Sequence, residues 1–175
     1  MPLPVAHALL GASLVAALHP QPTRRFAIPL VLGAVLAGAA DLDFFLVFGL
    51  GSKTWHRGFS HSVLLGLFVT LLFAFSLGRK RIKEAIAFGL AFTSHGILDY
   101  VTTREGAGIE MIWPFSSERF VLGWWGLSEV PSKLPAIEIL KNLLIEFLIF
   151  APVLFVVLWL RKRRRTHVAF PPKEK

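Results

Sequence analysis

Apolar residues along this chain form five long runs, and short polar or basic stretches separate them. An α-helix rises about 1.5 Å per residue, so runs of roughly 15 to 25 apolar residues approach or exceed the thickness of a bilayer's hydrocarbon core. We therefore predict that each run forms a membrane-spanning helix. The expected helices cover residues 3–18, 26–40, 63–77, 84–101 and 136–160.

Several ends of these helices are marked by residues that favour turns or caps. His19-Pro20-Gln21-Pro22 stops the first run because proline cannot continue a helix. Ser60 is placed to cap the third helix. Asp41-Leu42-Asp43 interrupts the second run, and residues two positions apart in an α-helix point roughly 200° apart. We expect a helix break there, with residues 44–50 continuing as a short interfacial piece.

The composition agrees with a membrane protein. Hydrophobic residues make up 54% of the 175 positions, against roughly 45–50% in soluble domains. The predicted fold class is all-α: a polytopic membrane protein of about five transmembrane helices, with one domain over residues 1–165 and a basic, disordered cytoplasmic tail over residues 166–175. The sequence has no cysteine, which excludes disulfides, thiolate catalysis and cysteine-ligated zinc sites.

The net charge of +8 is concentrated at three places. Basic clusters follow the first, third and fifth runs, at residues 24–25, 79–83 and 161–165. Because basic residues flank the cytoplasmic ends of membrane helices, the N-terminus is expected outside and the C-terminus in the cytoplasm of an inner, or plasma, membrane. The clusters are expected to contact anionic lipids rather than nucleic acid. No cleavable signal peptide is expected, since no basic residue precedes the first run.

This topology places ionisable residues from separate runs in one layer near the outer membrane face. Asp41 lies 16 residues after Arg25, and Asp99 lies 16 residues after Lys83. Both carboxylates therefore lie about 24 Å from a cytoplasmic anchor. The same layer is expected to hold His7, His56, His61 and Glu146.

Histidine and aspartate residues in this layer are candidate ligands for a divalent metal. His95 and Asp99 are spaced i, i+4 and share one helix face. Nitrogen and carboxylate ligands suit zinc foremost, with manganese or iron as alternatives, and the number of donors would serve one or two ions. The predicted ligands are His56, His61, His95 and Asp99, followed by Asp41, Asp43 and His7.

Each candidate also has a purely structural interpretation. His95 and Asp99 could form a hydrogen bond within the membrane, and two histidines in an outer loop could simply be solvated. Asp41 and Asp43 could cap a helix, and His7 could pack against apolar neighbours.

Two further residues are predicted to assist catalysis. Arg57, between His56 and His61, could hold phosphoryl or carboxylate oxygens, although a surface salt bridge is the alternative. Glu146 belongs to a polar stripe with Glu138 and Asn142 and could act as a general base. Its alternative role is a hydrogen bond between helices.

A metal centre beside an arginine favours hydrolysis of a phosphoester, carried by a phospholipid or a lipid-linked substrate. Two other functions remain open. A membrane amidase or protease could use one zinc ion. A metal transporter or scaffold would not be an enzyme, but the cytoplasmic halves of the runs are nearly all apolar, which disfavours transport.

These residues also resemble the YdjM-like, LexA-regulated family of inner-membrane proteins, which are described as metal-dependent hydrolases. The resemblance covers roughly residues 4–115, and its central seven-residue motif is specific. The matching motifs are His7 with Gly11, Asp41-Leu42-Asp43, His56-Arg57-Gly58-Phe59-Ser60-His61-Ser62, His95 to Asp99 with Thr102, and Trp113-Pro114.

The resemblance implies phosphodiester chemistry, because this family is considered distantly similar to zinc-dependent phospholipase C enzymes. Two positions depart from the family pattern. Ser60 replaces the usual threonine and keeps the hydroxyl, and Ala40 replaces the proline that usually precedes Asp41. The second departure weakens the expectation of a helix break.

Overall fold

The computed structural model describes residues 2–20, 26–103, 108–124 and 136–169, and within them the fold is all-α as predicted. Apart from one isolated bridge between Ile109 and Phe120, the described residues contain no β-structure. Among these described residues, six α-helices are joined in part by short 3₁₀ turns. The helices are α1 (Pro4–Leu18), α2 (Ala27–Gly38), α3 (Phe44–Leu50), α4 (Val63–Leu77), α5 (Ile82–Thr102) and α6 (Ala136–Ala169), and the turns are η1 (Ala39–Asp43), η2 (Lys53–Trp55), η3 (Phe59–His61) and η4 (Arg79–Arg81).

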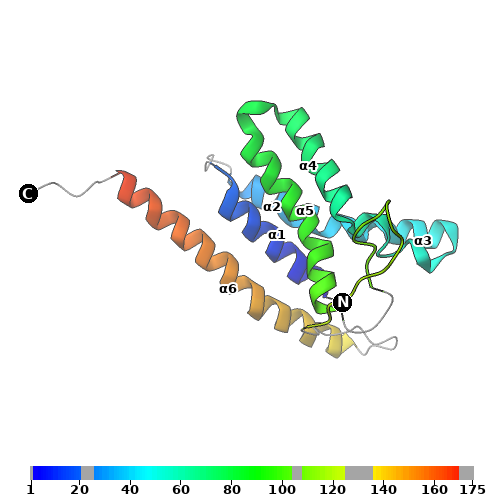
Figure 1. Ribbon diagram of the computed structural model, residues 1–175. Helices are drawn as coiled ribbons and strands as arrows, with labels where there is room; N and C mark the ends of the chain where they lie inside the picture. Colours follow the sequence, from blue (N-terminus) through cyan, green and yellow to red (C-terminus); the bar gives the residue numbers. More distant parts are fainter. Residues whose placement is uncertain (1, 21–25, 104–107, 125–135, 170–175) are drawn as a thin grey trace, which may run out of the picture.

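Helix α1 lies at the centre and packs against α2, α5 and α6, while α4 packs against α5 (Figure 1). Small residues allow the closest approach. A Cβ atom added to Gly11 of α1 would lie 2.4 Å from the carbonyl oxygen of Gly33 of α2. Close approach at small residues is typical of helix packing in membranes, where dispersion contacts must replace the hydrophobic effect.

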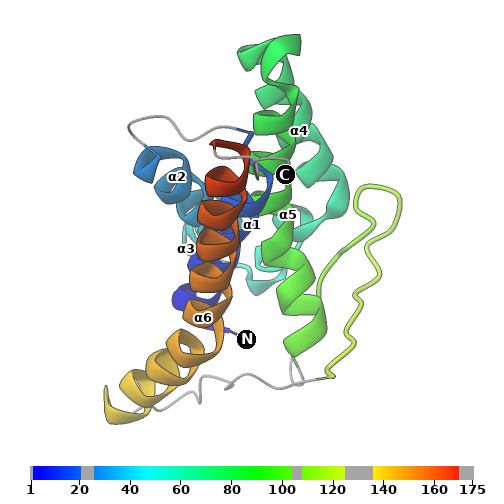
Figure 2. The same ribbon diagram turned by 90° about the vertical axis from the view of Figure 1, so that its left-hand side faces the viewer.

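Large apolar side chains cover the outside of the bundle. Phe75 of α4 is 90% exposed and Phe155 of α6 is 69% exposed. Helix α6 runs along α1 at the edge of the bundle, so most of its surface faces outward (Figure 2). Such surfaces are costly in water and are expected of helices that face lipid.

Length and composition support two to three of the five predicted spans within the described residues. Residues Ala27–Leu50 and Ala136–Arg164 are long and apolar enough to cross a membrane. A third span forms if Lys53–His61 and Val63–Leu77, which meet at a bend of 51°, count as one element. Helix α1 is apolar but has only 15 residues.

Two predicted helix boundaries were wrong. Ser62, not Ser60, caps α4, because the Ser62 hydroxyl accepts a hydrogen bond from the Leu65 amide. Helix α6 continues to Ala169, beyond the predicted end at residue 160 and into the predicted tail. The remainder of that tail, residues 170–175, and the basic cluster at residues 24–25 lie outside the described residues.

Polar side chains join α1, α5 and α6 at one end of the bundle. His19 Nε2, just after α1, lies 3.3 Å from Glu84 Oε2 of α5, and Glu84 also pairs with Arg81. Arg161 of α6 donates a 2.6 Å hydrogen bond to the carbonyl oxygen of Ala16. The basic clusters after the third and fifth runs therefore lie at the same end as the C-terminus of α1.

Candidate metal centre

The 3₁₀ turn η1 directs two aspartates toward the same cluster. In an α-helix, which turns roughly 100° per residue, side chains two positions apart point roughly 200° apart, or roughly 160° measured the shorter way. In a 3₁₀ helix, which turns roughly 120° per residue, the same angle between Asp41 and Asp43 is only roughly 120°. The predicted break is thus a change of helix type. The chain continues from α2 through η1 into α3 as one apolar stretch of 24 residues.

The loop between α3 and α4 carries both histidines of the central motif. Its η3 turn places His61 against α5, where Gly96 leaves room for the backbone. A Cβ atom at Gly96 would lie 2.3 Å from the His61 carbonyl oxygen. Glycine at this position therefore fixes how closely the loop approaches His95 and Asp99, which are on the same helix.

All seven predicted ligands come together in the structure. They form three overlapping groups, in each of which one potential ligand atom per residue lies within 4.8 Å of the others. His95 belongs to two groups and Asp41 also belongs to two, so the groups form one continuous cluster. The groups are His7, His95 and Asp99; Asp41, His61 and His95; and Asp41, Asp43 and His56.

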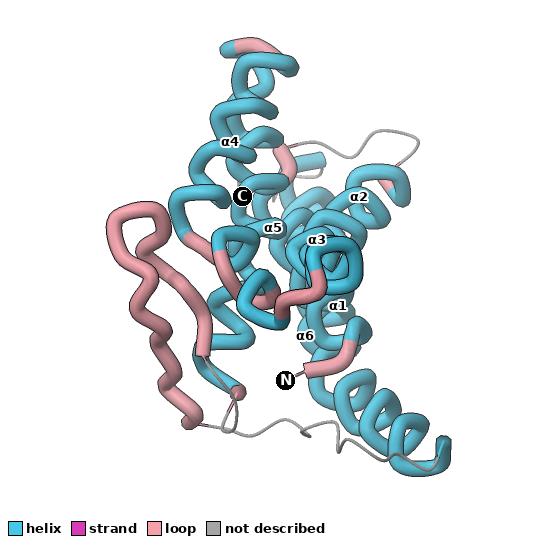
Figure 3. The backbone as a smooth tube through the Cα atoms, turned by 90° about the vertical axis from the view of Figure 1, so that its right-hand side faces the viewer, coloured by secondary structure: helices cyan, strands magenta, loops and turns pink. Residues whose placement is uncertain are grey.

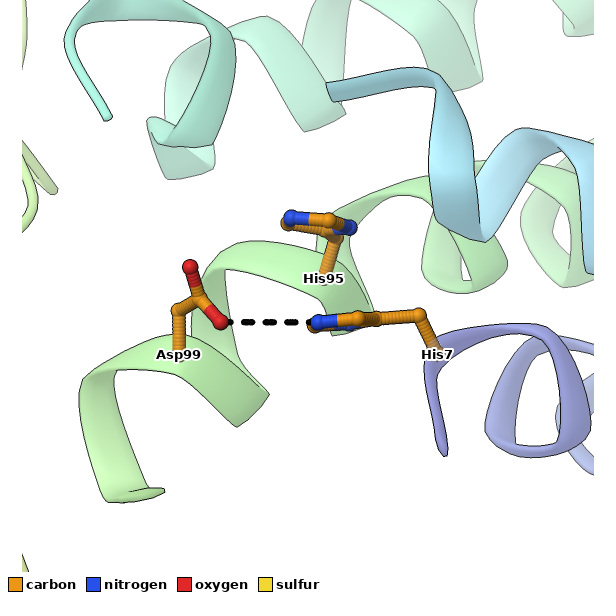
Figure 4. A group of neighbouring side chains, drawn as sticks. All are labelled: His7, His95 and Asp99. Atoms are coloured by element: carbon orange, nitrogen blue, oxygen red, sulfur yellow. Dashed lines mark ion pairs between the residues drawn. The ribbon is translucent and has the colours of Figure 1, made fainter. Parts of the chain in front are cut away.

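Figure 4 shows the first group, in which α1 supplies His7 and α5 supplies His95 and Asp99. The imidazole rings of His7 and His95 stack with centroids 3.8 Å apart. His7 Nε2 lies 3.5 Å from Asp99 Oδ1. On the other side of the carboxylate, His61 Nε2 lies 3.5 Å from Asp99 Oδ2.

Hydrogen bonds orient three of the imidazole rings in the same way. His95 Nδ1 lies 2.5 Å from the carbonyl oxygen of Ala37 and must donate to it, because a carbonyl oxygen can only accept. His56 Nδ1 lies 2.9 Å from Asp43 Oδ1, where it donates to the carboxylate. In a neutral ring with a proton on Nδ1, Nε2 keeps a lone pair for a metal.

Ser60 extends this arrangement to His61. The Ser60 hydroxyl donates its single proton to Asp43 Oδ2, at 2.6 Å. Its oxygen therefore accepts from His61 Nδ1, which lies 2.9 Å away. Nε2 of His61 is left facing the cluster, like Nε2 of His56 and His95.

The atoms that face the centre of the cluster are buried and have no hydrogen-bond partner in the part of the chain that the structure describes. A buried polar atom without a partner costs roughly 1–3 kcal/mol, so several together need a common partner. A divalent cation would satisfy lone pairs and carboxylates at once, and these residues therefore fit a metal. The atoms are Nε2 of His7, His56, His61 and His95, Oδ1 of Asp41, and both carboxylate oxygens of Asp99.

The comparisons with known proteins agree with the membrane character of the fold. The protein family described as "YdjM inner membrane protein" matches this chain over residues 1–169. The chain belongs to this family. It is also 33% identical over 106 residues to inner membrane protein YbcI of Escherichia coli (strain K12). That match covers 58% of the chain and 60% of YbcI, so the chain spans about three fifths of this relative's length. No solved structure matches the chain.

In this member of the YdjM family, Asp43 has different surroundings from the other two aspartates. Its Oδ1 accepts from His56, and its Oδ2 accepts from Ser60 and from the backbone amide of Arg57 at 3.0 Å. Both oxygens already have protein donors. Asp43 is therefore suited to orienting His56 and the loop, whereas Asp41 Oδ1 and both oxygens of Asp99 accept no hydrogen bond from the described residues.

Arg57 lies at the cluster, as the sequence predicted. Its side chain is only 10% exposed, and Nε lies 3.5 Å from Asp99 Oδ2. Its backbone has φ 61°, a left-handed conformation that is uncommon for residues other than glycine. The Asp43 carboxylate holds the Arg57 amide, and the Glu110 amide donates a 3.0 Å hydrogen bond to the Arg57 carbonyl. Strain of this kind is typical of functional sites.

Glu146 makes hydrogen bonds between helices, of the kind that the sequence analysis gave as its alternative role. The carboxylate is fully buried and accepts hydrogen bonds from the backbone amides of Leu3, at 2.5 Å, and Ala6, at 3.0 Å. Both oxygens thus bind the N-terminus of α1, where amides have no partner within the helix. Glu146 belongs to none of the three ligand groups, so its contacts do not favour a general base.

Three contributors to the site were not predicted. Ser60 was expected only as a helix cap, and the Ala37 carbonyl carries no signal in the sequence. Arg119 supports the loop from outside by donating to the carbonyl oxygens of Thr54, at 2.6 Å, and His56, at 3.2 Å. Ser60 belongs to the central motif, whereas Arg119 reaches the motif only through the fold.

Proposed function

We propose that this protein is a membrane-bound, metal-dependent hydrolase that cleaves a phosphoester of a phospholipid or a lipid-linked substrate. The observation that carries the proposal is the set of buried, unpartnered histidine nitrogens and aspartate oxygens beside a buried arginine. Buried ionisable groups in a membrane protein are functional by default, because placing them there is costly.

The proposed ligands are His7, Asp41, His61, His95 and Asp99, with His56 at the edge of the cluster and Asp43 orienting it. Mixed imidazole and carboxylate donors favour zinc, although manganese or iron would also fit. One or two ions would bind, since the ligand groups overlap without coinciding. A bound divalent cation supplies an activated water and Lewis acidity toward phosphoryl oxygens.

Arg57 is proposed to hold the substrate's non-bridging oxygens. A guanidinium offers a planar fork of donors that matches two phosphoryl oxygens. Because both hydrogen-bonding groups of its backbone are engaged by Asp43 and Glu110, the side chain is held in place beside Asp99 before substrate arrives. Preorganised donors of this kind stabilise developing charge.

The site is proposed to face the outer side of the membrane. The N-terminus would be outside, the C-terminus in the cytoplasm, and the basic residues near Arg81 and Arg161 would contact anionic lipids. A headgroup could then enter from the outer leaflet.

Metal analysis of the purified protein tests the ligand set. Wild type is expected to retain zinc through purification, and His95→Ala and Asp99→Ala are expected to lose most of it while remaining folded. His19→Gln is the matched control, because His19 lies at the opposite end of the bundle. Unchanged metal content in both cluster variants would make the pair structural.

A substrate panel tests the reaction class. Metal-loaded wild type in detergent is expected to cleave a short-chain phospholipid, and His95→Ala is expected to be inactive. Cleavage of an amide substrate without cleavage of any phosphoester would instead identify a zinc amidase. Metal binding without turnover of either substrate would identify a metal-binding protein that is not a hydrolase.

A further inference from the structure

A cavity of about 210 Å³ lies directly beside the central motif and is not part of the metal cluster. Its wall is formed by the turn η2, by the central motif and by segment 108–124. Segment 108–124 is an extended loop whose end is hydrogen-bonded to the last turn of α5 (Figure 3). The cavity is lined by Thr54, Trp55, Gly58, Phe59, Glu110 and Trp113.

Aromatic rings and oxygen atoms make up much of the wall of this cavity. Three of its six residues are aromatic, and the rings of Phe59 and Trp113 are 5.6 Å apart at an angle of 55°. Three oxygen atoms converge near Gly58. A Cβ atom there would lie 3.2 Å from the Trp55 carbonyl oxygen and 3.6 Å from both Glu110 Oε2 and the Thr54 carbonyl oxygen. The Thr54 carbonyl already accepts from Arg119 and the Trp55 carbonyl from the Gly58 amide, so the Glu110 carboxylate oxygen, together with the aromatic faces, is what favours a cation.

Glu110 contributes a carboxylate oxygen that its partner leaves available. Arg119 Nη2 contacts Oε1 of Glu110 at 3.0 Å, and Arg119 is not among the residues that line the cavity. Oε2 is the oxygen beside Gly58. Arg119 therefore holds Oε1 of Glu110 without lining the cavity, and Oε2 lies on the side of Gly58 and the cavity.

We propose that this cavity binds the ammonium group of a phospholipid headgroup. This assignment rests on the proposed function and specifies its substrate class. Gly58, which lines the cavity, follows Arg57, whose Nε lies 3.5 Å from Asp99 Oδ2, so the two proposed subsites are carried by neighbouring residues of one loop. Cation–π contacts and the Glu110 carboxylate then recognise the positive charge.

The exposed residues around the cavity indicate a lipid as the source of this group. Phe115 is 81% exposed and Trp124 is 79% exposed, and both lie on the segment that forms one wall. Aromatic residues of this kind gather where membrane and water meet. A headgroup would therefore approach at the level at which the cavity opens.

Calorimetric titration of the purified full-length protein in detergent tests the cavity without requiring turnover. Phosphorylethanolamine and phosphorylcholine are expected to bind roughly 2- to 30-fold more tightly than glycerol phosphate, because only they carry an ammonium group. Glu110→Gln keeps an oxygen for Arg119 but removes the charge, and it should abolish this preference. Trp113→Leu should reduce the preference through an independent change.

Two variants serve as matched controls. Glu118→Gln removes an exposed charge from the same segment, and Trp124→Leu removes a tryptophan that does not line the cavity. Both should keep the wild-type preference. Equal affinity of wild type for all three phosphates would overturn the proposal, as would an unchanged preference in both Glu110→Gln and Trp113→Leu.

Hydrolysis of vesicles separates this proposal from the proposed function. Vesicles of phosphatidylethanolamine should be cleaved faster than vesicles of phosphatidylglycerol by wild type, and the ratio should approach one in Glu110→Gln. Equal cleavage of both lipids by wild type would reject the ammonium cavity and retain the hydrolase. A headgroup preference in calorimetry without any cleavage would retain the cavity and reject the hydrolase.

Discussion

Asp43 and Asp99 are both buried carboxylates in the cluster, but their hydrogen bonds differ. The oxygens of Asp43 accept from His56, Ser60 and the Arg57 amide. Those of Asp99 accept no hydrogen bond from the described residues and lie between His7 and His61. The two residues should therefore respond differently to the same substitution.

Asp43→Asn is expected to weaken zinc binding roughly 10- to 100-fold, the usual effect of removing a partner that orients a ligand. Asp99→Asn should remove nearly all bound zinc, because an amide oxygen is a poorer ligand than a carboxylate. Competition with a chelator of known affinity measures both. Equal losses in the two variants would show that Asp43 also binds the metal.

Arg57→Lys is expected to keep bound metal and fold but to lower phosphodiesterase activity roughly 10²- to 10³-fold. Lysine keeps the positive charge but cannot present two donors in one plane. Turnover of a short-chain phospholipid measures the effect, and Arg79→Lys, at an exposed position beside the opposite end of α4, is the control. Wild-type turnover in Arg57→Lys would remove Arg57 from the mechanism.

The sequence predicted which residues meet because their chemistry is unusual for an apolar chain. His95 and Asp99 share a helix face by spacing, and charge placement put Asp41 at the same height. The different surroundings of Asp41 and Asp43 result from the hydrogen bonds that Asp43 makes with Ser60 and a backbone amide. Those contacts arise from the path of the loop, which spacing along the chain does not determine.

At the level of helices, α6 supplies hydrogen-bond partners for backbone groups at both ends of α1. Glu146 accepts from amides at the N-terminus of α1, and Arg161 donates to the Ala16 carbonyl near its C-terminus. Unpaired groups at helix ends are costly where water is scarce. A helix of 15 residues is about 22 Å long, shorter than a hydrocarbon core of about 30 Å, and α6 supplies a side-chain partner to each of its ends.

Glu146→Ala is expected to destabilise the protein by about 1–3 kcal/mol, because it leaves buried amides of Leu3 and Ala6 without a partner. Thermal unfolding in detergent should show a lower midpoint both with and without zinc. Glu138→Ala, on the same helix at a more exposed position, should have a smaller effect. A variant with wild-type stability but no activity would return Glu146 to a catalytic role.

The helices themselves were predicted most accurately where glycine or charge stops an apolar run. Helix α4 spans the predicted residues because Gly78 and the basic cluster follow it. Helix α6 was predicted too short because its basic residues were interpreted as a boundary. Arginine and lysine are good helix formers, so a helix can continue through them into water.

Over the whole molecule, α1 and α6 run in the same direction, since residues 3 and 6 meet residue 146 while residue 16 meets residue 161. Parallel first and last helices agree with an odd number of crossings between them and opposite sides for the two termini. The histidine cluster and the basic residues lie at opposite ends of these helices.

Reporter fusions test this orientation. A reporter that is active only in the cytoplasm should give signal when fused after Lys175 and none when inserted in the loop at residues 51–55. A reporter that is active only outside should give the opposite pattern. Signals that are reversed in both sets would place the metal cluster on the cytoplasmic side.

The ligand cluster draws on four stretches of chain, from His7 to Asp99, and its inward atoms make no hydrogen bond with the described residues. With the proposed metal, binding energy becomes folding energy, and each tenfold increase in free metal adds about 1.4 kcal/mol per ion. A cell that is starved of zinc would then hold more of this protein in partly opened forms, which proteases remove. The abundance of the protein would follow the zinc supply even when its synthesis does not change.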